Sequence, residues 1–413
     1  MSLIVMKFGG TSVATIERIM NAARHVKREV EAGHQVIVNV SAMAGITDQL
    51  VGYVREVSDL KDIEEYADYD VVVSTGEQVT AGLMALHLRS QGILARAWTG
   101  WQIPIITDGA HSKARVEEIH TENIMKSIEA GRVAVVTGFQ GVTPEGRVTT
   151  LGRGGSDTSA VALAAAFGAD RCDIYTDVDG VYTCDPRIVE GVRKLERVSY
   201  EEMLEMASLG AKVLQTRSVE IAMNHNVVLQ VRSTFSDAPG TLLVKEDEAM
   251  EQQRITGIAY SRDEARITLS GVKDKPGVSA AIFGPLAEAN INVDMIVQNV
   301  TPDGKVTDVT FTVTRGDLKN ALRALEAVKD VLEYQSLHTD AKVAKLSVIG
   351  VGMRSHAGVA QQMFETLAEK NINIMAITTS EIKISVLIDE SYIELALRAL
   401  HTAYGLDAVV EKG

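Results

Sequence analysis

The stretch Thr149-Thr-Leu-Gly-Arg-Gly-Gly-Ser-Asp-Thr-Ser159 connects the end of an expected β-strand to an expected helix. Threonine and leucine favour a strand end, whereas the three glycines within 152–155 permit positive φ angles and close approach of a ligand. Residues 156–158 are typical N-cap residues, and the alanine-rich run 160–167 predicts a helix that ends near Gly168. Free amides and the positive end of a helix dipole meet in such a loop, which therefore predicts an anion site.

Arg153 adds a planar guanidinium group that matches a carboxylate or a phosphate. The alternative is a tight strand-to-helix turn with an exposed arginine, because glycine-rich turns are common in α/β proteins. The stretch matches neither G-x-x-x-x-G-K-[ST] nor G-x-G-x-x-G, so the sequence supports neither a P-loop nor a dinucleotide fingerprint.

The composition is that of a globular protein with two or three domains, since 413 residues are 46% hydrophobic and 23% charged. A formal charge of −14 argues against nucleic-acid and anionic-membrane partners. Cys172 and Cys184 are the only cysteines, too few for a zinc site, and indicate a reducing compartment. No signal peptide is evident and no apolar run approaches the roughly 20 residues of a membrane span, so we expect a cytoplasmic protein.

Residues 3–41 predict a βαβ unit. A buried strand at Leu3–Phe8 leads through a glycine turn into a helix whose apolar residues recur from Ile16 to Val30, and Gln35–Ser41 is the next strand. Lys7 falls at the carboxyl end of the first strand, where open α/β sheets bind ligands. The alternative is a surface lysine at a strand edge.

Three further polar residues are candidates for a ligand pocket. Ser41 and Thr47 flank a small-residue turn, where they could bind a ligand or, as the residues alone favour, cap the next helix. Glu77 stands beside Gly76 among uncharged neighbours, an unusual place for a carboxylate that only solvates the surface. Periodicity does not decide whether residues 71–73 form a strand or a helix. We predict no metal site in the protein, because no set of calcium-loop ligands is found.

The C-terminal part contains an internal repeat. Leu286-Ala-Glu-Ala-Asn-Ile-Asn-Val293 matches Leu367-Ala-Glu-Lys-Asn-Ile-Asn-Ile374 at an offset of 81 residues (367−286), the offset that also separates Gly277 from Gly358 (358−277). Each copy predicts a strand, a glycine turn, a helix, two strands and a helix, which is a ferredoxin-like βαββαβ unit. The charged segment Lys245–Gln253 lacks the regular spacing of apolar residues that a core-facing element shows, so it is the best candidate for a linker between domains.

Six motifs follow one another along the chain: Lys7-Phe-Gly-Gly-Thr-Ser-Val13, Ser41-Ala-Met43, Ser74-Thr-Gly-Glu77, Gly138-Phe-Gln-Gly141, Leu151-Gly-Arg-Gly-Gly-Ser-Asp157 and Thr176-Asp-Val-Asp-Gly-Val-Tyr182. These motifs together resemble those of the aspartate kinases, over the whole chain and in the order of that family. The resemblance implies an α/β fold, with an amino-acid-kinase-like three-layer domain around a mainly parallel sheet and then two ferredoxin-like ACT domains. The implied division is a catalytic domain at 1–245, a linker and first strand at 246–264, and ACT domains at 265–336 and 337–413. The length resembles the single-function form of the family.

The resemblance also implies roles for individual residues. Lys7 would contact the transferring phosphoryl group, Asp157 would hold Lys7, and Lys212 would be a third catalytic residue. The aspartate pocket would comprise Ser41, Thr47, Glu77 for the substrate ammonium, Arg153 for the α-carboxylate, and Gly154, Gly155 and Ser156. The ATP site would comprise Lys7, Phe8, the amides of Gly9 and Gly10, Thr176, Asp177, Tyr182, Arg187, Ala211 and Lys212.

The implied activity is ATP-dependent phosphorylation of L-aspartate with Mg²⁺, under feedback control by lysine, threonine or both through the ACT domains, in a homo-oligomer. The effector sites would comprise Asp274, Gly277, Val278, Asn292, Asp294 and Gln298 in the first module. Their counterparts in the second would be Ser355, His356, Gly358, Val359, Asn373, Ile374 and Glu381. These residues could instead only cap turns and solvate strand ends.

The expected chemistry needs no general base, because the nucleophile is a carboxylate that is already ionised at pH 7. Alignment and neutralisation of charge on the moving phosphoryl group would then carry catalysis. Two alternatives stay open on the residues alone. One is a related kinase that acts on another acid such as glutamate, and the other is a catalytically silent amino-acid sensor.

Overall fold

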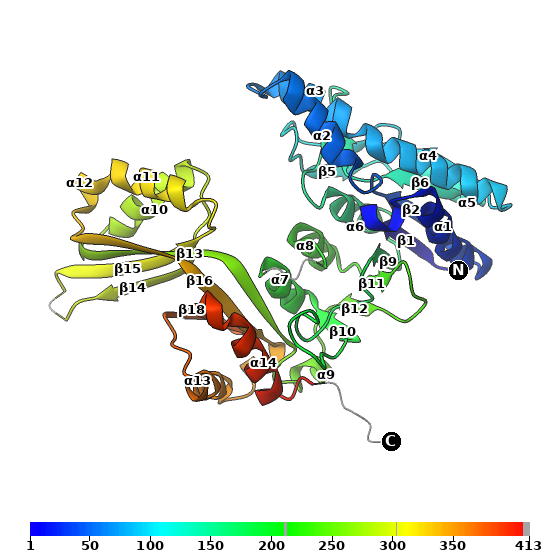
Figure 1. Ribbon diagram of the computed structural model, residues 1–413. Helices are drawn as coiled ribbons and strands as arrows, with labels where there is room; N and C mark the ends of the chain where they lie inside the picture. The colour runs from blue at the N-terminus through cyan, green and yellow to red at the C-terminus, as the bar shows by residue number, and fades with distance from the viewer. Residues whose placement is uncertain (210–212, 303, 408–413) are drawn as a thin grey trace, which may run out of the picture. The chain divides into compact units, whose positions relative to one another are not determined.

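The computed structural model describes residues 1–209, 213–302 and 304–407 (Figure 1). It forms two compact units. Within the described residues, the first unit comprises 1–181, 194–207 and 213–246, and the second comprises 182–193, 208–209 and 247–407. In the part of the chain that the structure describes, no helix has both the length and the apolar character that a membrane crossing needs.

The first unit is built on an eight-stranded sheet with the order β10-β12-β11-β9-β1-β2-β6-β3. Its strands are β1 (Leu3–Phe8), β2 (Gln35–Val40), β3 (Ala95–Trp98), β6 (Val133–Thr137), β9 (Arg171–Thr176), β10 (Arg197–Ser199), β11 (Leu229–Ser233) and β12 (Thr241–Val244). Every neighbouring pair is parallel except β11 and β12. The mainly parallel sheet and the two strands predicted at 3–8 and 35–41 are therefore confirmed.

A smaller sheet with the order β5-β4-β7-β8 adjoins the same unit. Its strands are β4 (Ile105–Thr107), β5 (Val116–Ile119), β7 (Gln140–Val142) and β8 (Val148–Thr150). The β7 and β8 strands form an antiparallel pair. The last residue of β8 lies directly before the glycine-rich loop, so this sheet fixes the start of that loop.

The first unit also contains helices, several of which pack on the eight-stranded sheet. They are the 3₁₀ turn η1 (Gly10–Val13), α1 (Ile16–Glu31), α2 (Ile46–Val57), α3 (Ile63–Val73), α4 (Thr75–Ser90), α5 (Glu122–Glu129), α6 (Gly155–Ala166), α7 (Tyr200–Ser208) and α8 (Thr216–His225). The core between α1, α4 and the sheet contains Ile4, Met6 and Phe8 of β1. Since side chains alternate along a strand, Lys7 points to the other face, which α6 covers.

Two sequence predictions about helix starts are wrong. The helix after the glycine-rich loop begins at Gly155, with Gly154 as its N-cap at φ +73°, so residues 156–158 lie in its first turn instead of capping it. Gly154 can take this left-handed conformation without a Cβ clash, which lets the helix start earlier. Likewise α2 has Gly45 as its N-cap, at φ +83° and without a side-chain cap, so neither Ser41 nor Thr47 serves that purpose.

The structure settles the local conformation at two further places. Residues 71–73 are helical and form the end of α3, because tertiary packing overrides the strand propensity of valine. Ser199 and Glu202 form a capping box at the start of α7. The Ser199 amide donates to Glu202 Oε2 over 3.0 Å, and the Glu202 amide donates to Ser199 Oγ over 3.2 Å.

The second unit contains one antiparallel six-stranded sheet with the order β14-β15-β13-β16-β18-β17. Its strands are β13 (Gly257–Lys273), β14 (Asp294–Val300), β15 (Val306–Val313), β16 (Ser336–Ile349), β17 (Ala376–Thr379) and β18 (Lys383–Asp389). Its helices and 3₁₀ turns are α9 (Glu248–Glu251), α10 (Val278–Glu288), α11 (Leu318–Ala327), α12 (Lys329–Leu332), η2 (Val351–Arg354), α13 (Val359–Glu369), η3 (Glu390–Tyr392) and α14 (Ile393–Ala403).

The two ferredoxin-like modules share their long central strands. The second half of β13 pairs with β15 and, over 266–270, with 336–340 at the start of β16, while its first half, 257–261, pairs with 345–349 of β16 (Figure 1). Each module therefore receives a strand segment from the beginning of the other. The repeated Asn-Ile-Asn has a local cause as well, because Asn290 and Asn371 take positive φ values of 55° and 52° just past α10 and α13.

A segment from the middle of the chain, 182–193, belongs to this second unit. Cys184 and Val189 are part of the apolar core of the second module. The Thr183 hydroxyl lies 2.9 Å from His401 Nε2, and His401 Nδ1 lies 2.9 Å from Asp407. Both cysteines of the chain are buried and free of disulfide bonds.

Candidate active site

The candidate site begins with an ion pair between β1 and α6. Lys7 Nζ lies 2.5 Å from Asp157 Oδ1, and each residue is only 8% exposed. A Cβ atom on residue 9 would lie 3.3 Å from this ammonium, so the glycine there leaves room for it. Asp157 lies in the first turn of α6, which brings the lysine to the positive end of the helix dipole. The structure thus places a buried ion pair and the start of α6 together at the carboxyl end of β1.

Glu77 is a buried carboxylate with one free oxygen. It lies in the first turn of α4 and is 2% exposed. Its Oε1 accepts a 3.0 Å hydrogen bond from the Ala42 amide, which ties it to the loop after β2, whereas Oε2 has no hydrogen-bond partner among the described residues. Burial raises the pKa of Glu77 to about 7. A buried carboxylate with an unpaired oxygen is suited to a cationic ligand.

Arg153 stands on the glycine-rich loop with its guanidinium exposed. No carboxylate within the described ranges forms an ion pair with it. The loop takes left-handed backbone conformations at Gly152 and Gly154, with φ values of +76° and +73°. A Cβ atom at position 154 would lie 2.1 Å from Gln215 Cγ, so only glycine fits there. Arg153 is therefore an exposed donor on a glycine-shaped loop, and its guanidinium can bind a carboxylate or a phosphate.

The remaining predicted pocket residues lie at the ends of these elements. Ser41 follows β2, and its amide donates to the Phe8 carbonyl over 3.1 Å. Thr47 is in the first turn of α2. Ser156 Oγ would lie 3.0 Å from a Cβ atom at Gly138, so the loop after β6 and the first turn of α6 are close together.

Two predicted nucleotide contacts involve groups that already have partners in this structure. The Gly9 amide already donates to the Tyr175 carbonyl over 3.1 Å, so it cannot donate to phosphate in this arrangement. The Phe8 side chain is fully buried and stacks on the Tyr175 ring at 4.8 Å between centroids, so only its backbone could reach a ligand. Gly10 begins η1 and packs closely against the Ala42 carbonyl, so a residue with a Cβ atom would be crowded at this position.

The other predicted nucleotide residues are divided between the two units. Thr176 ends β9, and its hydroxyl donates to Asp177 Oδ1 over 3.1 Å. Tyr182 and Arg187 belong to the second unit, where the Arg187 guanidinium donates to both oxygens of Asp185 over 3.0 and 2.8 Å. The predicted contacts at Ala211 and Lys212 lie outside the described residues.

Four of the six predicted effector residues of the first module line a hollow of about 540 Å³. Asp274, Gly277, Val278 and Gln298 line it, and Gly277 is the N-cap of α10. Asp294 is not among the lining residues. Instead it forms an ion pair with Lys345 of β16. Asn292 is exposed at the chain turn that leads into β14.

In the second module the predicted residues repeat only part of this arrangement. Gly358 is the N-cap of α13 at φ +92°, and Val359 is the first residue of that helix. His356 Nδ1 lies 2.8 Å from the Gly352 carbonyl. Glu381 Oε2 lies 3.4 Å from Arg354 Nε. Ser355 ends η2, while Asn373 and Ile374 precede β17.

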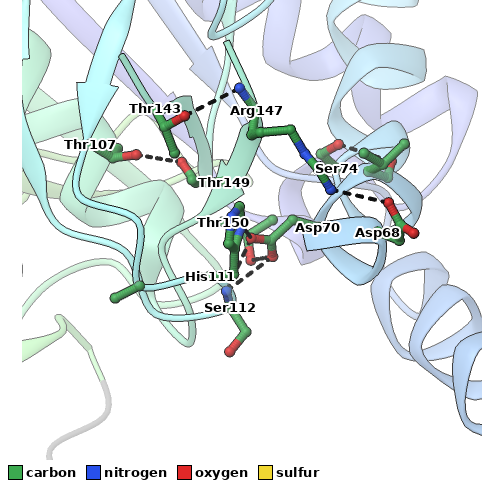
Figure 2. A network of polar contacts seen from close by, with 12 residues as sticks. Asp68, Asp70, Ser74, Thr107, His111, Ser112, Thr143, Arg147, Thr149 and Thr150 are labelled. Carbon is green, nitrogen blue, oxygen red and sulfur yellow. Dashed lines mark hydrogen bonds and ion pairs between the residues drawn. The ribbon is translucent and has the colours of Figure 1, made fainter. Parts of the chain in front are cut away.

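Sequence reasoning missed a fully buried carboxylate, Asp70, near the end of α3. Figure 2 shows that His111, Ser112 and Thr150 converge on it from two other segments. Burial raises the pKa of Asp70, and the hydrogen bonds from these residues oppose that increase. One signal was present, since an aspartate directly before three valines is unexpected in a helix that packs against a sheet.

A mainly parallel sheet with a paired lysine and a glycine-rich loop at its carboxyl edge, followed by two ferredoxin-like modules, defines an amino acid kinase with ACT domains. Comparison with protein families agrees. The amino acid kinase family matches residues 2–233, and the ACT domain matches residues 266–330 and 346–404.

Individual proteins narrow the assignment. An aspartate kinase of Stutzerimonas stutzeri is 54% identical over 99% of this chain and 98% of its own length. The crystal structure of Escherichia coli aspartokinase III with aspartate and ADP has a TM-score of 0.80 at 26% identity, covering 97% of this chain and 99% of that one. The structure of the same enzyme with lysine and aspartate has a TM-score of 0.78 at 26% identity, with the same coverage. The chain belongs to the aspartate kinase family, and ATP-dependent activity follows from its place among these kinases.

Proposed function

We propose that the chain transfers the γ-phosphoryl group of ATP to the β-carboxylate of L-aspartate, giving 4-phospho-L-aspartate for lysine, threonine and methionine biosynthesis. The observation that carries this proposal is Glu77. A carboxylate that is 2% exposed and keeps one oxygen unpaired suits an ammonium ligand, which an α-amino acid provides. Crystals of Escherichia coli aspartokinase III contain aspartate and ADP, which supports the same ligands here.

In this proposal, two groups recognise the amino-acid end of aspartate. Glu77 Oε2 takes the α-ammonium, and the guanidinium of Arg153 binds the α-carboxylate through two parallel hydrogen bonds. Ser41, Thr47 and Ser156, with the backbone of Gly154 and Gly155, complete the pocket. The β-carboxylate is then directed toward Lys7, whose position Asp157 fixes over 2.5 Å.

The reaction needs charge neutralisation more than proton transfer. One oxygen of the substrate β-carboxylate attacks the γ-phosphorus, the bond to the β,γ-bridging oxygen breaks, and ADP leaves with that oxygen. Lys7 stabilises the charge that spreads over the phosphoryl oxygens, and we propose that Lys212 assists. On the nucleotide side, the site would use Gly10, Thr176, Asp177, Tyr182 and Arg187, with Ala211.

Mg²⁺ is proposed to arrive with ATP. The described residues include no group of three or more His, Cys, Asp or Glu side chains arranged to bind a metal ion. This donor set fits an ion that nucleotide phosphates and water coordinate for the most part, since Mg²⁺ retains several waters and commonly uses substrate phosphates. When bound, it would neutralise phosphate charge.

Trapping the product tests the proposed reaction. Acyl phosphates react with hydroxylamine, so aspartate, ATP and Mg²⁺ should yield a hydroxamate whose amount equals the ADP formed. ADP release without hydroxamate would show hydrolysis of ATP by water and would contradict transfer to the β-carboxylate.

The ACT domains are proposed to bind lysine, threonine or both, and to lower activity when occupied. The hollow next to Asp274 offers a carboxylate for an effector ammonium and the start of α10 for its carboxylate. The lysine found with Escherichia coli aspartokinase III is consistent with such a ligand. Asn292, Asp294 and Gln298 in one module, and residues Ser355 to Val359, Asn373, Ile374 and Glu381 in the other, are the further proposed effector contacts.

We also propose a homo-oligomer that assembles through the ACT domains. The edge strands of the six-stranded sheet expose Ile296 and Val300 on β14 and Ile377 on β17, which supports a partner on that surface. Two buried free thiols are consistent with the proposed cytoplasmic location.

A further inference from the structure

Asp70 lies at a junction between the two segments that carry Glu77 and Arg153. Its backbone carbonyl accepts a 3.1 Å hydrogen bond from the Ser74 amide at the end of α3, and α4, which carries Glu77, begins at the next residue, Thr75. Its side chain faces β8, which ends three residues before Arg153. One buried side chain therefore connects the start of the Glu77 helix to the start of the Arg153 loop.

The carboxylate accepts hydrogen bonds from two segments other than its own (Figure 2). Thr150 Oγ1 donates to Oδ1 over 2.5 Å, and His111 Nδ1 lies 2.8 Å from Oδ2. The Ser112 amide lies 3.1 Å from each oxygen. Because a carboxylate only accepts, His111 donates from Nδ1.

The loop that carries His111 and Ser112 also contacts the glycine-rich stretch directly. A Cβ atom at Gly152 would lie 3.0 Å from the Ser112 carbonyl, so the backbone of residue 112 packs against residue 152. The Ala114 amide donates to the Thr150 carbonyl over 2.9 Å. Arg217 closes this arrangement, since its guanidinium donates to the Leu151 carbonyl over 3.2 Å and to the Ala114 carbonyl over 2.8 Å.

A second link between α3 and β8 lies at the surface. Arg147, just before β8, contacts Glu64 over 3.1 Å and Asp68 over 3.3 Å. These side chains are 43%, 76% and 83% exposed, so solvent weakens the ion pairs. Asp70 is fully buried, where each hydrogen bond is stronger and a lost partner is costly. The buried contact between Asp70 and Thr150 is therefore the one that fixes the separation between α3 and β8.

We propose that Asp70, with Thr150 and His111, is a positioning group for substrate binding, which holds the Arg153 loop at a fixed separation from Glu77. The inference rests on the proposed function, because Glu77 and Arg153 are there assigned to the ammonium and the α-carboxylate of the substrate. Asp70 itself touches no substrate. Its effect on catalysis passes through the geometry of the pocket.

The chain provides a matched control in Thr149. Its hydroxyl lies 2.6 Å from Thr107 Oγ1, so it is a buried hydroxyl in a single hydrogen bond on the same strand as Thr150. Thr149→Val and Thr150→Val each remove one buried hydroxyl and retain the branched shape. Only Thr150→Val removes a donor to Asp70.

The test compares Asp70→Asn, Thr150→Val, Thr150→Ser and Thr149→Val in two measurements. The first is hydrogen–deuterium exchange at residues 151–155, where the Leu151 amide donates to Phe139 and the Gly155 amide donates to Gly152. The second is the KM for aspartate and for ATP. We expect faster exchange and a rise of roughly 10- to 100-fold in the aspartate KM for Asp70→Asn, with a smaller rise for Thr150→Val. The ATP KM should be unchanged, Thr150→Ser should restore wild-type values, and Thr149→Val should match wild type.

The positioning role would be overturned if hydrogen exchange at residues 151–155 were the same in Thr150→Val and Thr149→Val. It would also be overturned if Asp70→Asn remained folded and its aspartate KM were unchanged. If Asp70→Asn does not fold, the two valine variants decide the question. Absence of aspartate-dependent ADP release from the wild-type enzyme would overturn the proposed function instead. The exchange comparison would still decide whether Asp70 fixes the loop.

Discussion

The ammonium of Lys7 lies 2.5 Å from the carboxylate of Asp157, although one residue ends a strand and the other begins a helix far along the chain. This pair exists because β1 alternates its side chains, which directs Lys7 to the α6 face of the sheet. The pairing neutralises a carboxylate that would otherwise repel phosphate. It also leaves the ammonium beside Gly9, the N-cap of η1.

Replacement of Lys7 should abolish turnover without unfolding the protein. Loss of one donor to transition-state charge costs about 3–4 kcal/mol, or roughly 100- to 1,000-fold in kcat. Lys7→Ala should therefore fall in this range, while its circular dichroism spectrum matches that of the wild type. Asp157→Asn should lower kcat less, because the lysine remains but loses its anchor. Activity of Lys7→Ala within about tenfold of wild type would exclude Lys7 from the chemistry.

The pKa of Glu77 predicts how aspartate binding depends on pH. Burial raises this pKa from 4.5 to about 7, and the proposed ammonium contact requires the ionised form. The aspartate KM should therefore rise as the pH falls below about 7, by close to tenfold for each pH unit well below that value. Steady-state kinetics between pH 6 and pH 8 measure this, and Glu77→Gln should remove the dependence along with most of the affinity. A flat aspartate KM over this range would contradict the assignment.

The same carboxylate should reduce stability at high pH. Between pH 4.5 and about 7 the folded protein retains a proton that the unfolded chain has released, so stability decreases as the pH rises through this window. Above the window the penalty is constant at about 3 kcal/mol, as an upper estimate. Glu77→Gln should accordingly raise Tm at pH 8 more than at pH 5. An equal change in Tm at both pH values would show that burial of the charge does not destabilise the fold.

Arg153 should affect the KM for aspartate and not the KM for ATP. Lysine provides a point charge that cannot reproduce two parallel hydrogen bonds to a carboxylate. Arg153→Lys should therefore raise the aspartate KM strongly. Arg147→Lys is a suitable control, because Arg147 is also exposed near β8 but pairs with Glu64 and Asp68. A raised ATP KM with an unchanged aspartate KM would assign Arg153 to the nucleotide.

Feedback control should depend on Asp274. If its carboxylate binds the ammonium of an effector, Asp274→Ala should weaken inhibition by lysine plus threonine and leave activity without effectors near that of wild type. A coupling of about 1–3 kcal/mol would change activity roughly 5- to 150-fold, which sets the range to measure. Asp330→Ala removes an exposed carboxylate of the same module outside the hollow and should leave inhibition intact. Unchanged inhibition in Asp274→Ala would place the effector site elsewhere.

Much of the fold could be predicted because strand and helix periods are local properties. The parallel sheet followed from alternating apolar strands and helices, and the two modules followed from the repeated Leu-Ala-Glu and Asn-Ile-Asn motifs. Lys7 could be placed at the carboxyl end of the first strand for the same reason. The start of α6 was missed because serine, aspartate and threonine are good caps, while Gly154 takes the cap conformation without any side chain.

The contacts that sequence could not give all depend on distant partners. Whether the Gly9 amide is free depends on Tyr175, which belongs to another strand. The role of Asp70 depends on His111 and Thr150, and both are far from it in the sequence. The sharing of β13 and β16 by the two modules is equally invisible in a repeat, because each copy contains its own full set of predicted strands.

The most direct test of the proposed function is an ADP-release assay with ATP and Mg²⁺ and, in parallel, aspartate, glutamate or no acceptor. We predict ADP release that requires aspartate, with glutamate giving little above the rate without an acceptor. Lys7→Ala, run beside the wild type, should abolish the signal and so exclude a contaminating kinase. Preference for glutamate would reassign the substrate. The same rate in all three conditions, including no turnover at all, would contradict an aspartate kinase activity for this chain.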